Sequence, residues 1–404
     1  MLALFKNIKG DKALWAVVAL LALFSFLPVY SASSNLVYVV GKGTTMGHLM
    51  KHAFLLVLGF GIIYGVHRIP TRFFKGLSIM ALPIVLVLLV FTLAQGTTIG
   101  GANASRWISI PLVGITFQTS NLAAVVLMIY VARYLTKIKD EAVTFKESLI
   151  PLWLPVFLVI ALILPANFST AAIIFSMVLL LCFLGGYPFK YLAGIVGAGV
   201  LCLALFILTA KAFPSLFENR IDTWENRISN FTDGGDTEAD YQIERAKIAI
   251  ATGGIMGKGS GKSIQKNFLP QSSSDFIYAI IIEEYGLVGG FLLMFFYLLF
   301  LFRIVVIANA NKTIFGKLLV LGVGLPIIFQ ALINMAVAVE LFPVTGQTLP
   351  LISSGGTSSW MTCLAIGIIL SASVKETARK RKSTSSKLDN MDMTNPLEVL
   401  SGQL

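Results

Sequence analysis

Long apolar runs separated by short polar segments are the dominant pattern in this chain of 404 residues. Apolar runs of about 17–25 residues are long enough to cross the hydrocarbon core of a bilayer as helices. They predict ten spanning helices, at residues 13–31, 48–66, 77–95, 119–134, 149–165, 168–186, 190–210, 276–302, 318–339 and 358–374. The pattern therefore predicts an all-α polytopic membrane protein with one large extracytoplasmic loop, residues 211–275.

The basic residues between the apolar runs predict the orientation of the chain. Lys and Arg are enriched in short cytoplasmic loops next to spanning helices. If the N-terminus is cytoplasmic, the short outer loops carry only Lys42, Lys51 and Arg106, and the inner segments carry many more basic residues. Both termini are thus expected inside a cytoplasmic (inner) membrane, with residues 1–374 as the membrane domain. The basic, Ser/Thr-rich tail 375–404 is expected to be disordered.

Composition supports a membrane protein and argues against a disulfide-rich or zinc-binding one. Hydrophobic residues make up 56% of the chain and charged residues 13%, with a mean hydropathy of +0.83, which is typical of a polytopic membrane protein. The three cysteines lie in apolar runs, and the three histidines lie near the ends of the second predicted helix. Neither set has the spacing of a disulfide framework or a zinc site.

The large loop contains signals for two helices. Residues 217–228 place apolar side chains at helical spacing, as in a helix lying at a membrane interface. Thr237–Asp240 resembles a capping box and predicts a second helix that continues to Thr252. Gly253 and Gly254 would end that helix.

A glycine-rich, basic segment follows, at residues 253–266. Its Gly-Lys-Ser at 261–263 invites a P-loop interpretation, but Met256 stands where the motif needs glycine and no strand precedes it. Consecutive backbone N–H groups beside Lys258, Lys262 and Lys266 could still cradle an anion such as a diphosphate. A flexible linker is the alternative.

Asp275 stands between this basic segment and the eighth predicted helix. Charged groups near a membrane are costly and usually have a function. A plain structural role is N-cap of the eighth helix, which Asp performs well. A helix N-terminus would also favour the ionised carboxylate, so Asp275 is expected to be available as a base at neutral pH.

Two long, ordered regions resemble one family. The first runs from Tyr241 to Gly286 and includes Leu269-Pro270, Ser274-Asp275-Phe-Ile277 and Glu283-Glu284-Tyr-Gly286. The second holds Asn334, Phe342-Pro-Val-Thr-Gly346 and Leu349 through Ser358. Together with the ten expected helices, they make the chain resemble the SEDS family (shape, elongation, division and sporulation), the FtsW and RodA proteins. Ser263-Ile-Gln-Lys266 is more similar to FtsW, the division member, than to RodA, the elongation member.

The resemblance implies a peptidoglycan glycosyltransferase that polymerises lipid II, the undecaprenyl-diphosphate-linked disaccharide pentapeptide. The reaction would take place at the outer face of the cytoplasmic membrane, at the division septum. It implies a divalent cation (Mg or Mn) and no organic cofactor. It also implies a class B penicillin-binding transpeptidase and FtsQ/FtsL/FtsB-type division proteins as partners, beside membrane lipids and without nucleic acid. The alternatives are a lipid II flippase, an elongation-type (RodA-like) polymerase and a non-catalytic activator of a transpeptidase.

The residues expected to carry this chemistry follow from the matching motifs. Asp275 matches the catalytic aspartate of the family. Groups expected to bind substrate are Arg106, Lys258, Lys262, Gln265, Lys266, Ser353, Ser354 and Thr357, although Arg106 fits an interfacial anchor equally well. Glu283, Glu284 and Asn334 are expected to be structural polar residues that pair inside the bundle. The metal ligands remain unknown.

The chain departs from the family pattern at two places. Asn121 stands where the family usually has a glutamate, with Ala124 in place of its lysine. Asn167 stands where many members have an aspartate after proline. A role for a second acid, or for metal binding by that glutamate, cannot be carried over. Asp275 is left as a more isolated candidate.

Overall fold

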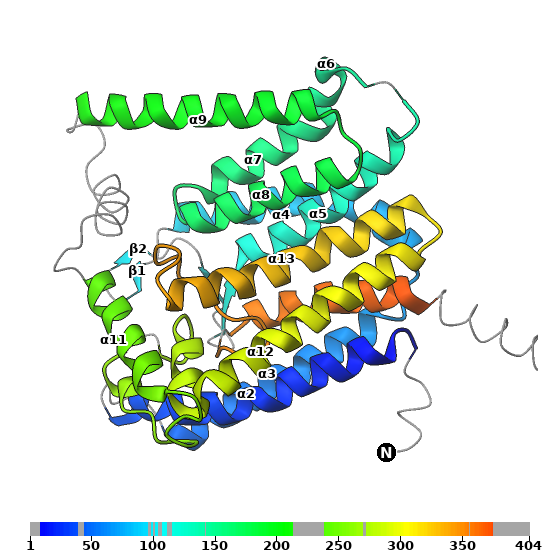
Figure 1. Ribbon diagram of the computed structural model, residues 1–404. Coiled ribbons are helices and arrows are strands. Elements are labelled where there is room, and N and C mark those ends of the chain that lie inside the picture. Colours follow the sequence, from blue (N-terminus) through cyan, green and yellow to red (C-terminus); the bar gives the residue numbers. More distant parts are fainter. Residues whose placement is uncertain are drawn as a thin grey trace, which may run out of the picture.

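The computed structural model describes residues 9–38, 44–95, 98–99, 102–103, 107–110, 115–141, 143–212, 238–269, 272–354 and 356–374. Within these residues the chain is a bundle of helices whose axes are roughly aligned (Figure 1). Arg106, the proposed interfacial helix at 217–228 and the tail 375–404 lie outside the described residues.

All ten predicted spans coincide with helices, which confirms the fold class. In the described part of the chain, seven segments are long and apolar enough to cross a membrane, and three apolar helices are shorter. The long segments are α2 (Lys12–Tyr38), α3 (Thr45–Val66), α4 (Arg72–Gln95), α5 (Thr119–Lys137), α6 with α7 (Phe145–Ser148, Leu154–Ile163), α12 (Ile277–Ala310) and α13 (Ile314–Ala338). The shorter ones are α8 (Phe168–Leu184), α9 (Phe189–Ala212, its apolar part reaching Cys202) and the last helix, Ser358–Val374. A π-helical turn, Leu149–Trp153, joins α6 to α7.

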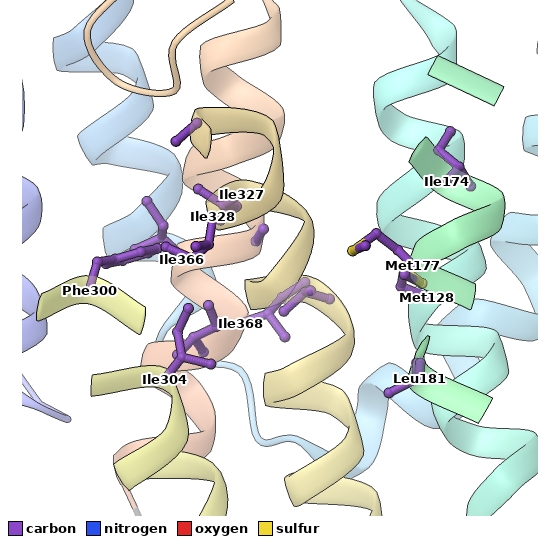
Figure 2. Close-up of a cluster of buried hydrophobic side chains, with 14 of the residues drawn as sticks. Met128, Ile174, Met177, Leu181, Phe300, Ile304, Ile327, Ile328, Ile366 and Ile368 are labelled. Carbon is purple, nitrogen blue, oxygen red and sulfur yellow. The ribbon is translucent and has the colours of Figure 1, made fainter. Parts of the chain in front are cut away.

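The helices pack through interlocking aliphatic side chains. Figure 2 shows Ile304 of α12, Ile327 of α13 and Ile368 of the last helix within one cluster of buried hydrophobic side chains. Gly324 on α13 lets the helices approach, since a methyl group there would lie 2.9 Å from Ile304. Small residues at helix contacts are the usual means of close packing within a membrane. The helix α9 lies along one edge of the bundle, against α8 (Figure 1).

Polar structure gathers at one end of the bundle, which we call the site end. Two short hairpins lie between α4 and α5: β1 (Thr98–Ile99) with β2 (Ala102–Asn103), and β3 (Trp107–Ile110) with β4 (Ile115–Gln118). The sequence pattern did not predict these hairpins. The helix α11 (Glu238–Gly253) confirms the helix predicted from the capping box. A 3₁₀ turn, Gln265–Asn267, follows it.

The eighth predicted helix is two helices rather than one. The backbone of Gly286 has φ 69° and ψ −173°, which interrupts α12. Residues 287–310 form the longer piece, about 36 Å at 1.5 Å per residue, enough to cross a bilayer. Residues 277–284 are all buried. A helix that is buried on every side must pack against protein all round, so this short piece is enclosed at the site end.

The opposite end of the bundle holds both ends of the described chain. Asp11 caps α2 by accepting from the N–H of Leu14 at 2.8 Å. The same carboxylate forms an ion pair with Arg303 of α12, through both its oxygens. The Asp11 N–H donates to Ser373 Oγ at 2.9 Å. These contacts join α2, α12 and the last helix at this end.

Candidate functional site

Asp275 lies in a non-helical turn, residues 272–276, immediately before α12. The N-cap of α12 is Phe276, whose side chain makes no capping hydrogen bond. The proposed N-cap role of Asp275 is therefore wrong, because the helix begins one residue later than that role needs. The Asp275 side chain is half-buried, and its backbone oxygen accepts from Asn334 Nδ2 at 2.7 Å.

A loop between α13 and the last helix is fastened to this turn. Ser353 Oγ donates to the Ser274 carbonyl at 2.6 Å and accepts from the Leu349 N–H at 2.8 Å. The Ser354 N–H donates to the Ser273 carbonyl at 2.9 Å. Ser353 and Thr357, both expected to bind substrate, are buried. Ser353 and the backbone of Ser354 thus hold the loop against the Asp275 turn.

A chain of side-chain amides continues from Asp275 to α8. Asn334 Nδ2 also donates to the Gln347 carbonyl at 2.7 Å. Gln347 Nε2 donates to Thr170 Oγ1 at 3.0 Å. Asn167 is the N-cap of α8 and accepts from the Thr170 N–H at 3.2 Å. Asn167, noted as a missing family acid, therefore has a clear structural role beside the site.

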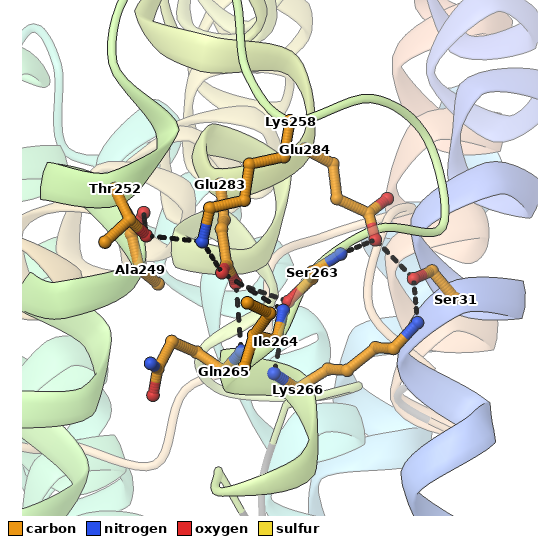
Figure 3. A network of polar contacts seen from close by, with 10 residues as sticks. All are labelled: Ser31, Ala249, Thr252, Lys258, Ser263, Ile264, Gln265, Lys266, Glu283 and Glu284. Atoms are coloured by element: carbon orange, nitrogen blue, oxygen red, sulfur yellow. Dashed lines mark hydrogen bonds and ion pairs between the residues drawn. The ribbon is translucent and has the colours of Figure 1, made fainter.

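Glu283 is the centre of a second polar cluster, which we call the carboxylate network (Figure 3). Its side chain is fully buried and forms an ion pair with Lys258 Nζ at 2.6 Å. It also accepts from the N–H groups of Ile264 at 3.1 Å and Gln265 at 3.2 Å, and from the Ser263 hydroxyl. Four donors around one carboxylate explain how a buried charge is tolerated here.

Glu284 connects the same segment to the first helix. It accepts from the Ser263 N–H at 3.2 Å and from the Ser31 hydroxyl of α2. Lys266 Nζ donates to Ser31 Oγ at 3.1 Å and to the Gly261 carbonyl at 2.8 Å. Glu283 and Glu284 both bind the glycine-rich segment rather than pairing with each other.

The glycines of that segment allow close backbone packing against the kink in α12. A methyl group on Gly253 would lie 2.2 Å from the Ile282 carbonyl oxygen, and one on Gly257 would lie 2.3 Å from that of Glu284. The N–H groups of Lys258 and Gly259 donate to the carbonyls of Glu283 and Glu284 at 3.0 and 2.9 Å. The N–H groups of Lys258 and Gly259, which were expected to help bind an anion, thus already donate to protein carbonyls.

The predicted substrate-binding residues consequently fall into separate groups. Lys258, Gln265 and Lys266 contribute to the carboxylate network. Lys262 is exposed, and Arg106 lies outside the described residues. Sequence reasoning missed Ser31, Thr170 and Gln347, which carry no motif signal because their partners are distant in the chain.

The described residues do not form a cage for a divalent cation. Among them, no three His, Cys, Asp or Glu side chains come together in a way that could hold a metal ion. Glu283 and Glu284 are taken up by the network. The cation requirement implied by resemblance stays a prediction.

The fold and the site define a multi-pass helical membrane protein. The Asp275 carboxylate lies at one end of its bundle, on a turn that hydrogen bonds hold in place. Residues 11–378 match the family model for cell cycle proteins of the FtsW, RodA and SpoVE type. The chain belongs to this family.

Relatives and solved structures agree with this assignment. The chain is 33% identical over 80% of its length to a protein of Nitrosococcus halophilus named probable peptidoglycan glycosyltransferase FtsW, covering 82% of that protein. A protein of the same name from Enterococcus hirae is 31% identical, with 94% of this chain and 96% of that one covered. A chain of a peptidoglycan synthase complex, solved in a study of how polymerization and crosslinking are coordinated, is 25% identical with a TM-score of 0.70, covering 91% of this chain and 98% of that chain. The RodA protein of Thermus thermophilus shares the fold, with a TM-score of 0.62 at 24% identity, covering 90% of this chain and 96% of that one.

Proposed function

We propose that the chain is a peptidoglycan glycosyltransferase of the division type that joins lipid II into glycan strands at the outer face of the cytoplasmic membrane. The observation that carries the proposal is the position of Asp275. Its half-buried carboxylate lies on a turn held by α13 and the loop before the last helix. Family membership and the names of the relatives support the class of reaction.

The reaction needs a base beside the attacking hydroxyl and positive charge beside the leaving group. Asp275 takes the proton of the 4-hydroxyl of one sugar as that oxygen bonds to the anomeric carbon of another. The bond from the anomeric carbon to the diphosphate breaks, and undecaprenyl diphosphate leaves with the electron pair. Arg106 and the exposed Lys262 are the candidates to meet the diphosphate, since Lys258 and Lys266 are engaged in the carboxylate network.

The surroundings of Asp275 support its role through rigidity. Its backbone carbonyl accepts from Asn334, and the neighbouring Ser274 carbonyl accepts from Ser353. A base that is fixed within its surroundings does not have to be ordered when substrate arrives, which favours proton transfer.

Partners and localisation extend the proposal. A solved relative belongs to a peptidoglycan synthase complex, which supports a class B penicillin-binding transpeptidase as partner. FtsQ/FtsL/FtsB-type regulators, a septal location and cytoplasmic termini rest on the resemblance and on the charge of the loops. An outer site end and an inner end with Asp11 and Arg303 fit this orientation.

The test uses purified full-length protein with its transpeptidase partner, lipid II and Mg²⁺ or Mn²⁺, in the presence of moenomycin to block the other class of polymerase. Glycan strands should form with the wild-type chain and should be absent with Asp275→Ala, while expression and partner binding persist. Full polymerisation by Asp275→Ala would refute the catalytic assignment. It would favour a base elsewhere, whereas inactivity of the wild-type complex would favour a flippase or an activator.

A further inference from the structure

The loop that is fastened to the Asp275 turn enters the bundle rather than lying on its surface. We call residues 346–354 the inserted loop. Its residues 349–353 are all buried. Gln330 Nε2 donates to the Thr348 carbonyl at 2.8 Å, and Gln330 lies about 12 Å before the end of α13, at 1.5 Å per residue. Non-helical backbone is tolerated at membrane depth only where protein encloses it or it lines a cavity.

Side chains of two spanning helices supply donors to the backbone of the inserted loop. On α13, Asn334 lies one turn beyond Gln330 and donates to the Gln347 carbonyl at 2.7 Å. On α12, the Tyr297 hydroxyl donates to the Pro350 carbonyl. Tyr297 is only 1% exposed, and it lies about 15 Å along the longer piece of α12. The single hydroxyl of Tyr297 is thus used to hold the inserted loop.

The inserted loop contains a strained residue next to this contact. Leu351 has φ 66°, in the left-handed region that residues other than glycine rarely adopt. Such a conformation persists only where the surrounding structure imposes it. Leu351 is buried and directly follows Pro350, whose carbonyl Tyr297 holds. The hydrogen bonds from α12 and α13 supply part of that constraint.

The other side of the inserted loop borders Asp275. Two hydrogen bonds, at 2.6 and 2.9 Å, fasten residues 353–354 to the carbonyls of residues 273–274. A methyl group on Gly346 would lie 3.6 Å from Asp275 Oδ2, so the loop backbone also approaches the carboxylate itself. A shift of the inserted loop therefore moves the turn that carries Asp275.

We propose that Tyr297 is a positioning residue for the reaction. From within the membrane it holds the inserted loop, and the loop sets the position of the Asp275 carboxylate. Gln330 acts in the same way from α13. The inference rests on the proposed function, in which Asp275 is the base, and it adds residues that act on that base through the inserted loop.

The informative variant is Tyr297→Phe, which removes the hydroxyl and keeps the ring. It is assayed as the full-length protein with its transpeptidase partner, lipid II and Mg²⁺ or Mn²⁺. We expect kcat to fall about 10-fold, because a displaced base loses rate steeply. KM for lipid II should stay the same, since Tyr297 is buried and holds protein rather than substrate. Amide hydrogen exchange should become faster in residues 272–276 and 347–354.

Tyr130→Phe is the matched control, because the Tyr130 hydroxyl also donates to a proline carbonyl, that of Pro151, at 2.6 Å. That bond joins α5 to the π-helical turn rather than to the inserted loop. Tyr130→Phe should leave kcat and exchange in the two segments unchanged, even where both tyrosine variants lose some stability. Gln330→Met removes a donor to the inserted loop from the other helix and should reproduce the effects of Tyr297→Phe. It also serves as the second variant if Tyr297→Phe does not fold.

Two results would overturn the positioning role. One is a wild-type kcat in Tyr297→Phe or, where that variant does not fold, in Gln330→Met. The other is an equal loss of kcat in Tyr130→Phe, which would show that activity follows overall stability.

Amide exchange separates this inference from the proposed function, because it needs no activity. If the wild-type complex does not polymerise lipid II, the proposed function fails. Faster exchange in residues 272–276 of Tyr297→Phe, but not of Tyr130→Phe, would then still support the hold of Tyr297 on the Asp275 turn. Unchanged exchange in those residues would overturn it.

Discussion

Two Lys–Glu pairs of nearly equal length differ sharply in burial, which allows a direct test of the carboxylate network. Lys258 lies 2.6 Å from Glu283, with side-chain exposures of 26% and 0%. Lys247 lies 2.7 Å from Glu340, with exposures of 51% and 45%. We expect Lys258→Met to be costly and Lys247→Met to be nearly neutral.

The expected magnitudes follow from burial. Removing one member of a buried ion pair costs about 3–5 kcal/mol, because the remaining charge is left without its partner. Lys258 is partly exposed and Glu283 keeps its other donors, so we expect about 2–3 kcal/mol for Lys258→Met. Exposed pairs contribute less than about 1 kcal/mol, which sets the expectation for Lys247→Met.

The assay is equilibrium unfolding of the two variants and the wild type in detergent micelles. Adding Glu283→Gln to Lys258→Met should cost less than the sum of the single changes, by about 1–3 kcal/mol, since the two residues are in contact. Amide exchange in residues 258–266 should rise in Lys258→Met alone. Equal destabilisation by the two lysine variants would show that burial does not set the strength of the network.

The backbone and the α8 cap give two further predictions. Gly286→Ala should prevent correct folding, because the methyl group would lie 2.1 Å from the Ile255 carbonyl oxygen at a positive φ; Gly61→Ala, with no atom within 4 Å, should be tolerated. A normally folded Gly286→Ala protein, judged by size-exclusion profile and thermal stability, would contradict the kinked packing. Asn167→Ala should lower the free energy of unfolding by about 1 kcal/mol through loss of the α8 cap, whereas Asn167→Asp should keep the cap. Thermal unfolding measures both variants, and equal unfolding midpoints for the two would argue against a capping role.

The sequence was sufficient for the spans and for α11. Apolar runs of membrane length leave few alternatives to helices, and the capping box with Gly253-Gly254 marks both ends of α11. The hairpins between α4 and α5 were missed because their strands are two to four residues long. Such short strands carry no usable alternation of apolar and polar side chains.

The site was predicted only in part. Asp275 followed from its motif, but its N-cap role was wrong, because α12 begins one residue later than that role needs and its N-cap is Phe276. Asp275 lies on a turn and Glu283 on the helix that follows it. The hydrogen-bond partners in the carboxylate network could not be predicted from sequence patterns, because they are far apart along the chain. Ser31 and Glu284, for example, are 253 positions apart.

The junction of Asp11, Arg303 and Ser373 has a consequence for how the protein is made. Asp11 is 292 positions from Arg303 and 362 positions from Ser373. During synthesis the first helix enters the membrane long before either partner exists. Contacts between distant residues form late and slowly, so the bundle can close only after its last helix has been inserted. A ribosome that stops before Ser373 releases a chain whose first helix still lacks its closing contacts.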